Sequence, residues 1–395
     1  MIKRTLKKIR GRVRRSLATG EERIVVSSPA VLRPSPADVL FEDRDGRVHI
    51  VDDSLRYRMK ETWRLFSPLS LLAELKERGL LDVSGVELLD RLKGSRTVTA
   101  SLEEMTDLVR PYAEKHENLL LGGSLGGIGK RVLRPEREEV ETRIEEGVLH
   151  HKALLEELSA LGVTVPAGAS IMEIGFISGG ESIVAFERLG FKGAGIDYFY
   201  DGAFDSNHRY KEVQRLTGTK VRFVPGDLTQ RTSFGDEEFN FIYSHQVLEH
   251  IRDLEAAFSE MSRILKPGGV MFHHYDPYFH PMGGHSFGTL DFPWGHVRLD
   301  EDDFARYIET LRPFEAPHAL PWCAGSLNRI NTIQRVQRKL VEAGFAIKLF
   351  KTTTTRFLKD MPLDRHVVRD CLERNPHLSL ADLLTSKIVV VAQKT

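Results

Sequence analysis

The chain has 395 residues, of which 41% are hydrophobic and 28% are charged, and its formal net charge is +0. It is too long for one ordinary core, so two domains are expected, and its charge argues neither for nor against a polyanionic partner. Its two cysteines, Cys323 and Cys371, lie far apart without metal-site spacing, which argues against a disulfide framework and a zinc site. No apolar run approaches the roughly 18 residues of a membrane span, and the cytoplasm is the expected compartment.

The first 40 residues are expected to be a basic helix and a linker. Residues 1–17 carry eight Lys or Arg and no acid, with apolar residues at helical spacing on one side. This pattern is typical of amphipathic helices that lie on anionic membranes or nucleic acid, and a basic tail without regular structure is the alternative. We expect a peripheral contact with the inner face of the membrane. Nucleic acid is the weaker partner, because the chain is neutral and lacks a recognisable RNA-binding module.

Residues 41–165 are predicted to be mainly helical, and no function is assigned to them. A hairpin near residues 43–51 is expected to turn at Asp45-Gly46. The glycines of residues 119–129 indicate a flexible connection or a lid, since the Gly-Lys-Ser/Thr ending of a nucleotide loop is lacking. One long amphipathic helix, or two joined ones, is expected over residues 134–161.

The stretch from Ile171 to Tyr198 is the most informative part of the sequence. A short apolar run leads to three glycines, of which the first is Gly175; a helical pattern follows, and a second apolar run ends at Asp197. Strand, glycine turn, helix and strand in this order form half of a doubly wound α/β sheet, whose ligand lies at the carboxyl ends of the strands. A dinucleotide site requires G-x-G-x-x-G, and this turn does not meet that pattern.

The same pattern continues along the chain. A strand predicted over residues 221–224 precedes Asp227, and another over residues 239–243 precedes S-H-Q-V-L-E-H. A strand over residues 270–274 follows the turn K-P-G-G, and a final strand is expected over residues 387–392.

Together these motifs resemble those of the class I S-adenosylmethionine-dependent methyltransferases, of the type 11-like group, over about residues 166–395. The resemblance implies a Rossmann-like, doubly wound, seven-stranded sheet and the cofactor S-adenosyl-L-methionine. It implies that Asp197 binds the ribose hydroxyls and Asp227 the adenine amino group, since carboxylates accept hydrogen bonds from both. The residues that it places at the cofactor are Glu173, Gly175, Ser178, Gly179, Asp197, Tyr198, Asp227, Leu228, Ser244 and His245. One position departs from the family pattern, because Ile177 stands at the usual middle glycine.

The methyl acceptor is expected beside a proline-rich insertion, residues 276–321, which is predicted to form loops. Five histidines lie between residues 270 and 300. An alcohol acceptor needs a general base, and imidazole suits that role near neutral pH. O-methylation is therefore favoured over N- or C-methylation, with His274, His296 and His250 as the candidate catalytic residues.

A bound metal is not predicted. Some methyltransferases with E-x-x-E-H at the place of the L-E-H segment bind a divalent cation there. In this chain Gln246 replaces the first carboxylate, and an amide is a weaker ligand for a hard cation. The sequence leaves metal dependence open.

The sequence therefore predicts a methyltransferase acting on an oxygen of a sugar, a glycoconjugate or a secondary metabolite. Two alternatives stay open. One is a scaffold that keeps the fold without turnover, for which Ile177 is the only sign. The other is an RNA methyltransferase that uses the basic N-terminus as a phosphate-tracking arm. The sequence indicates neither the acceptor itself nor an oligomeric state.

Overall fold

The computed structural model describes a defined set of residues: 39–51, 72, 75, 76, 79–94, 111, 112, 115, 137–176, 179–198, 209–311, 316–355 and 364–395. They belong to one compact unit, Pro36–Thr395. The predicted basic helix and linker, the glycine-rich residues 119–129, and Ile177 and Ser178 lie outside the described residues. Within the described part of the chain, no helix is both long enough and apolar enough to span a membrane.

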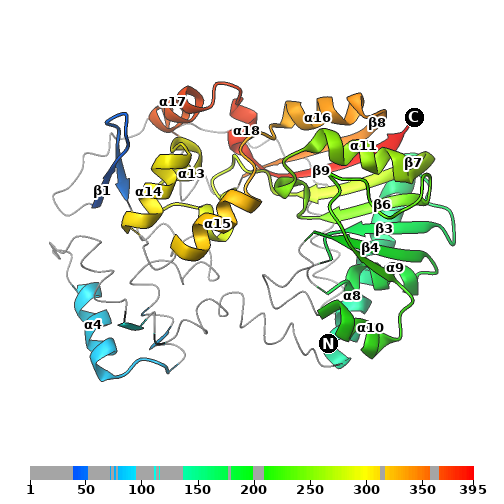
Figure 1. Ribbon diagram of the computed structural model, residues 1–395, viewed down its shortest axis with the longest axis horizontal. Coiled ribbons are helices and arrows are strands. Elements are labelled where there is room, and N and C mark those ends of the chain that lie inside the picture. The colour runs from blue at the N-terminus through cyan, green and yellow to red at the C-terminus, as the bar shows by residue number, and fades with distance from the viewer. Residues whose placement is uncertain are drawn as a thin grey trace. The chain divides into compact units, whose positions relative to one another are not determined.

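A seven-stranded sheet has the strand order β5-β4-β3-β6-β7-β9-β8 (Figure 1). Its strands are β3 (Ser170–Ile174), β4 (Lys192–Asp197), β5 (Arg222–Pro225), β6 (Phe239–His245), β7 (Leu265–Tyr275), β8 (Phe345–Thr354) and β9 (Thr385–Lys394). The first five in spatial order run parallel, and β9 pairs antiparallel with both β7 and β8. The chain order reverses between β3 and β6, which is where ligands bind in such sheets. The predicted doubly wound seven-stranded sheet is confirmed.

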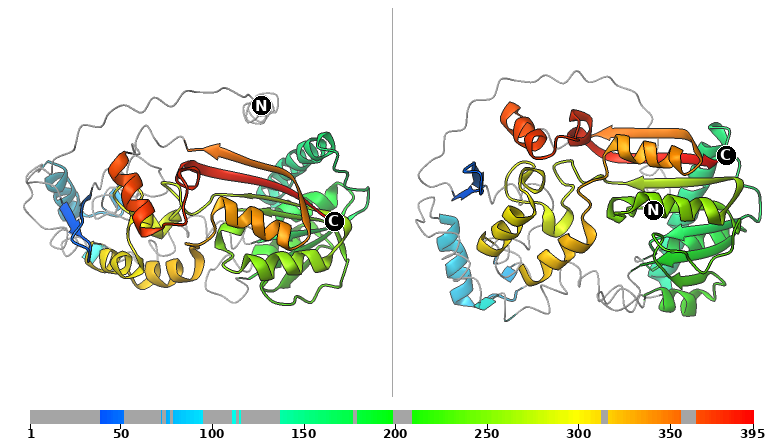
Figure 2. Two further views of the ribbon diagram at one scale, coloured as in Figure 1. Left: turned by 90° about the horizontal axis from the view of Figure 1, so that it is seen from above. Right: turned by 45° about the horizontal axis from the view of Figure 1, so that its top comes forward.

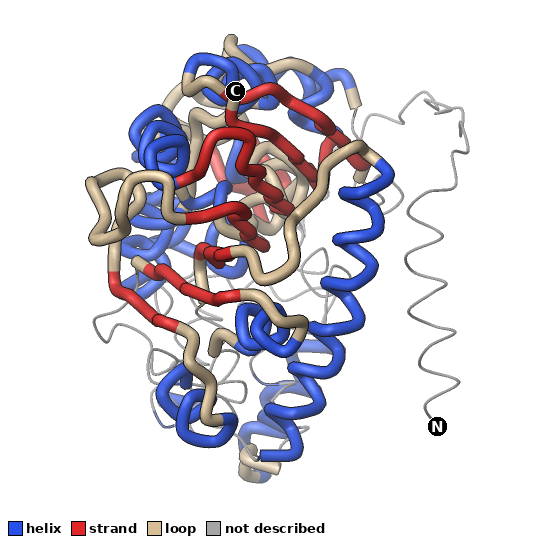
Figure 3. Tube along the Cα trace, turned by 90° about the vertical axis from the view of Figure 1, so that its right-hand side faces the viewer, coloured by secondary structure: helices blue, strands red, loops and turns tan. Residues whose placement is uncertain are grey.

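Helices cover both faces of this sheet. One face carries α8 (Arg137–Ala160), α9 (Glu181–Arg188) and α10 (Arg209–Thr217), and the other carries α11 (Leu254–Ile264) and α16 (Ile333–Glu342). The turned views of Figure 2 show the teal α8 and the orange α16 on opposite sides of the strands, and Figure 3 shows the helices flanking the red strands. The long helix predicted over residues 134–161 is confirmed as α8.

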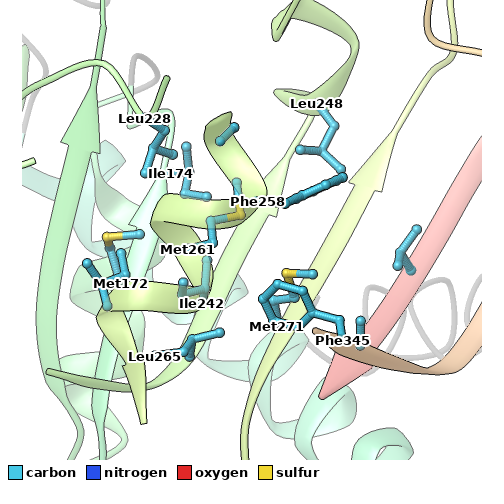
Figure 4. Close-up of a cluster of buried hydrophobic side chains, with 14 of the residues drawn as sticks. Met172, Ile174, Leu228, Ile242, Leu248, Phe258, Met261, Leu265, Met271 and Phe345 are labelled. Carbon is cyan, nitrogen blue, oxygen red and sulfur yellow. The ribbon is translucent and has the colours of Figure 1, made fainter. Parts of the chain in front are cut away.

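Alternation of side chains along the strands divides the apolar residues between two cores. Ile171 packs with α8 and α9, whereas its neighbour Met172 packs with α11. Figure 4 shows this second core, in which Phe258 and Met261 of α11 lie over the strand residue Ile242. Because both faces of the central strands are buried, their sequences read as continuous apolar runs.

The chain between β7 and β8 folds largely into helices, and the prediction of loops for residues 276–321 is wrong there. The helices are α12 (His285–Gly288), α13 (Gly295–Arg298), α14 (Glu301–Leu311) and α15 (Ala316–Ser326). Proline indicated loops, but Pro321 lies inside α15. The apolar residues of the insertion form a core of their own, in which Trp294 and Tyr307 are fully buried.

The hairpin predicted near residues 43–51 is confirmed, although its first strand begins earlier. Strand β1 (Val39–Glu42) pairs antiparallel with β2 (Val48–Val51). The turn between them has Gly46 at φ 76°, a conformation that favours glycine. Phe41 and Val51 belong to the core of the insertion, and the backbone N–H of Arg44 donates to the Asp303 carboxylate at 3.2 Å. The hairpin is therefore a structural part of the insertion.

The remaining described elements are α4 (Val83–Gly94), the 3-10 helix η3 (Leu248–His250), α17 (Arg365–Arg374) and α18 (Leu380–Leu384). A capping box between Ser379 and Asp382 begins α18. The K-P-G-G segment lies within β7, where Gly268 has φ 72° and the register with β6 shifts. The predicted turn is thus an irregularity at the start of a longer strand.

Candidate functional site at the carboxyl ends of the strands

The turn between β3 and α9 is built from glycines because its backbone enters the left-handed region. Gly175, Gly179 and Gly180 have φ 79°, 115° and 80°. The N–H of Gly175 donates to the Ile196 carbonyl at 2.8 Å, which ties the turn to β4. A Cβ at Gly175 would lie 2.5 Å from Cγ2 of Val247, the residue before η3. The turn therefore lies directly against the segment that follows β6.

Glu173 lies beneath this turn. Its Oε2 accepts a hydrogen bond from the backbone N–H of Ile183 at 3.1 Å, in the first turn of α9. Burial raises the pKa of Glu173 to about 8. The side chain holds the start of α9, and its predicted contact with a cofactor stays a prediction.

Two acidic residues follow the next strand ends. Asp197 is the buried last residue of β4, and its carbonyl accepts a hydrogen bond from the Gly226 N–H at 2.9 Å. That bond ties the end of β5 to the end of β4 and places Asp227 beside this edge. Oδ1 of Asp227 accepts from both the N–H and the hydroxyl of Thr229 at 2.8 Å.

Two predicted cofactor residues adjacent to these acids have opposite environments. Leu228 is buried and belongs to the core beneath α11. Tyr198 is 67% exposed.

Carboxylates at consecutive strand ends beside a glycine turn suit a ligand that offers hydroxyl and amine donors.

A pair of histidines stands at the ends of β6 and β7. His245 is the register partner of His274, and their ring centroids are 4.6 Å apart. Desolvation, which is incomplete because His245 is exposed and His274 is half-buried, lowers the pKa of each ring to about 4, together with the charges of His150 and Lys387. Both imidazoles are therefore neutral at pH 7, which is the state that accepts a proton.

Ser244, predicted at the cofactor, is buried. Its Oγ forms a 2.7 Å hydrogen bond with Nδ1 of the buried His273. Burial lowers the pKa of His273 to about 3. This pair lies within the sheet, one residue before the pair formed by His245 and His274.

The structure separates the other two candidate catalytic histidines from that pair. His250 lies on η3, and its Nδ1 donates to the Ser326 carbonyl at 2.7 Å. His296 is buried in the insertion, where its Nε2 donates to the Tyr278 carbonyl at 3.0 Å. The Tyr278 hydroxyl donates in return to the His296 carbonyl at 2.7 Å, so the geometry favours a structural role for His296.

Two side chains to which the sequence assigned no role lie beside His250. Glu249 of the L-E-H segment is buried, and the ring centroid of His285 lies 5.1 Å from that of His250. Glu249 was visible in the motif, whereas no local pattern marks His285 as its neighbour.

Comparison with known proteins matches this part of the chain. A family model described as a methyltransferase domain matches residues 172–273. A sterol 24-C-methyltransferase of Yarrowia lipolytica is 32% identical over 117 residues, which are 29% of this chain and 29% of that protein. An uncharacterized methyltransferase of Mycobacterium tuberculosis is 26% identical over 168 residues, or 41% of this chain and 63% of that protein. The part of the sterol enzyme that this chain matches is thus less than a third of that enzyme's length.

Among solved structures, the geranyl diphosphate C-methyltransferase of Streptomyces coelicolor is 17% identical, with a TM-score of 0.36 over 62% of this chain and 79% of that one. The sheet order, the glycine turn with its acidic strand ends and the matched family model agree with one another. The chain therefore carries a class I S-adenosylmethionine-dependent methyltransferase domain.

Proposed function

We propose that the chain transfers a methyl group from S-adenosylmethionine to an oxygen of a sugar, a glycoconjugate or a secondary metabolite. The observation that carries this proposal is the arrangement of two sets of residues along one edge of the sheet. Gly175 follows β3, Asp197 ends β4 and Asp227 follows β5. His245 ends β6, and His274 pairs with it one residue before the end of β7.

The residues at the ends of β3 to β5 fit the cofactor. S-adenosylmethionine, when bound, supplies an electrophilic methyl group on a sulfonium. A carboxylate such as that of Asp197 accepts two hydrogen bonds from a vicinal diol. Asp227 uses Oδ1 for Thr229 and has Oδ2 for an exocyclic amine. The left-handed glycines keep the turn free of side chains, so that a ligand can approach its backbone.

The histidine pair supports an oxygen acceptor. Methyl transfer to an alcohol requires removal of its proton, and a neutral imidazole is a suitable acceptor of that proton. His274 is half-buried and is the last residue but one of β7, the strand next to β6, close to where the acceptor is expected. We assign it the role of general base, with His245 as its neighbour.

The acceptor pocket lies beyond the region shared with other methyltransferases. The family match ends at His273, and the helical insertion begins shortly after β7. The 24-C-methylation named for the sterol relatives therefore belongs to those proteins, whose matched part is limited to 29% of their length. Methylation of carbon is the competing outcome of the test.

The basic segment 1–17 supports a further part of the proposal, which is contact with the inner face of the membrane and lipid-linked acceptors. Removing residues 1–17 is expected to abolish sedimentation with anionic vesicles and to slow methylation of lipid-linked sugars while sparing soluble ones. Unchanged sedimentation and unchanged activity on lipid-linked acceptors would contradict this part.

The test of the activity uses full-length protein and cofactor labelled in its methyl group. The acceptors offered in parallel are sugars, lipid-linked oligosaccharides, phenolic metabolites, sterols and RNA. In a second experiment, mass spectrometry of a deletion strain searches for a glycan or metabolite that lacks one methyl group. We expect label on an oxygen, with His274→Asn lowering kcat and leaving cofactor affinity unchanged. Label on sterol carbon or RNA overturns the acceptor class. Absence of cofactor binding in calorimetry at millimolar concentration overturns the enzyme and supports a scaffold.

A further inference from the structure

Three potential metal ligands converge beside the end of β6. Glu249 and His250 come from η3, and His285 comes from the start of α12 in the insertion. Each offers one ligand atom, and these atoms all lie within 4.8 Å of one another. The cluster therefore joins two parts of the chain that are distant in sequence.

Of the three residues, Glu249 has the environment that most favours a bound cation. It is only 4% exposed, and neither of its carboxylate oxygens completes a hydrogen bond with any residue that the structure describes. The backbone N–H groups of Glu249 and Asp276 lie near the carboxylate. A buried carboxylate without hydrogen bonds destabilises the fold, and a bound cation removes that penalty.

His250 has the hydrogen bond that is usual for a metal ligand. Its Nδ1 lies 2.7 Å from the Ser326 carbonyl oxygen, which can only accept, so Nδ1 carries the proton. The lone pair of the neutral ring is then on Nε2. A backbone carbonyl on one ring nitrogen fixes the tautomer and orientation of a histidine that binds metal through the other.

His285 is held in a conformation that side chains seldom adopt. Its φ is 52°, in the left-handed region, where a Cβ lies too close to the following carbonyl oxygen. The N–H of His285 donates to the Met282 carbonyl at 3.1 Å, and its ring centroid lies 5.1 Å from that of His250. The strained backbone places a second imidazole beside the first.

We propose that Glu249, His250 and His285 bind one divalent transition-metal ion. Two imidazole nitrogens and one carboxylate oxygen are a donor set of zinc and of Fe²⁺, whereas Mg²⁺, Ca²⁺ and Mn²⁺ prefer oxygen ligands. Ligand atoms around a tetrahedral ion at about 2.1 Å are roughly 3.4 Å apart, so small side-chain rotations close the site.

The three protein ligands leave a coordination position for water or an oxygen of a bound molecule. Gln246 stands where E-x-x-E-H proteins have a first carboxylate, and an amide disfavours a magnesium site. It is not one of the three ligands proposed here. Its Nε2 donates to Asp276 Oδ2 at 3.3 Å instead. The site is defined by His285, and it does not depend on the methyl-transfer proposal.

The experiment measures metal binding directly. Tag-free, chelator-treated full-length protein is titrated with Zn²⁺, Mn²⁺ and Mg²⁺ in separate calorimetric runs. We expect one Zn²⁺ per chain, bound more tightly than Mg²⁺. Glu249→Gln and His285→Gly are each expected to weaken Zn²⁺ binding by at least about tenfold. The matched controls Glu255→Gln, at an exposed site on α11, and His366→Asn, on α17, are expected to leave it unchanged.

Folding of the variants is checked without metal by thermal unfolding. Gln retains the shape of Glu249, and Gly suits the left-handed backbone at residue 285, so both variants are expected to unfold at or above the wild-type temperature. The site is wrong if wild type and both variants have the same Zn²⁺ affinity. It is also wrong if Zn²⁺ affinity is lost in His274→Asn and kept in Glu249→Gln and His285→Gly. Cofactor affinity, measured in the same variants, is expected to remain, which separates this proposal from the methyltransferase activity.

Discussion

The carboxyl group of Glu173 on β3 accepts a hydrogen bond from the backbone N–H of Ile183, 3.1 Å away in α9, so a buried acid holds the helix that follows the glycine turn. Burial raises the Glu173 pKa from 4.5 to about 8. Because the pKa is higher in the fold, the carboxyl group of the unfolded chain loses its proton at a lower pH than that of the folded protein. The contribution of Glu173 to stability is therefore complete below pH 4.5 and is lost as pH rises towards 8, by about 1.4 kcal/mol per pH unit.

Glu173→Gln keeps an acceptor for the Ile183 N–H but does not titrate. Urea unfolding at pH 5 and pH 8 is expected to show a smaller loss of stability with rising pH in the variant than in the wild type. Equal pH dependence of the two proteins would show that the carboxyl group is already ionised in the fold.

Gly175→Ala is expected to weaken folding and cofactor binding together, because a methyl group there meets Val247 at 2.5 Å in addition to the positive φ. Gly218→Ala is the matched control, since Gly218 has φ 68° with no atom within 4 Å of an added Cβ. The control is expected to lose about 1 kcal/mol of unfolding free energy, and Gly175→Ala more. Thermal unfolding and calorimetry measure both effects. Similar losses in the two variants would mean that Val247 moves aside.

Asp197→Asn is expected to lower the affinity for S-adenosylmethionine by roughly 10–100-fold, since hydrogen bonds to a charged group contribute about 1.5–3 kcal/mol. Asp302→Asn, at a surface carboxylate that pairs with Arg44, serves as the control and should bind as wild type does. Isothermal titration gives both dissociation constants. An unchanged constant for Asp197→Asn would remove this residue from the cofactor site.

His296→Asn tests whether a histidine chosen from the sequence acts in the fold or in the reaction. Its imidazole donates to the Tyr278 carbonyl inside the insertion, so a loss of about 1–3 kcal/mol of stability is expected, with cofactor affinity unchanged. Burial lowers its pKa to about 4, so the ring is neutral in the fold, and its contribution is present above pH 6.5 and lost as pH falls towards 4. A variant with full stability and no activity would restore the catalytic assignment.

The sequence predicted best those features that depend on residues close together in the chain. The glycine turn after β3, the acids Asp197 and Asp227 and the capping box at Ser379 depend on residues close in the chain, and each leaves a readable pattern. The helices of the insertion were missed because proline was taken to indicate loops, although the buried residues Phe304, Tyr307 and Leu311 of α14 fall at helical spacing. The neighbours of Glu249 and His296 depend on tertiary contacts that spacing cannot reveal.

The hairpin of residues 39–51 bears on how the helical insertion after β7 could be moved between proteins. Its Phe41 ring packs edge-on against Tyr307 of α14, and Asp43 pairs with Arg374 of α17 at 2.9 Å. A chimera that receives only residues 276–326 would expose the surface that this hairpin covers. Moving this insertion to another protein therefore requires three separate segments, namely the hairpin, residues 276–326 and α17, and the hairpin precedes β3 in the sequence.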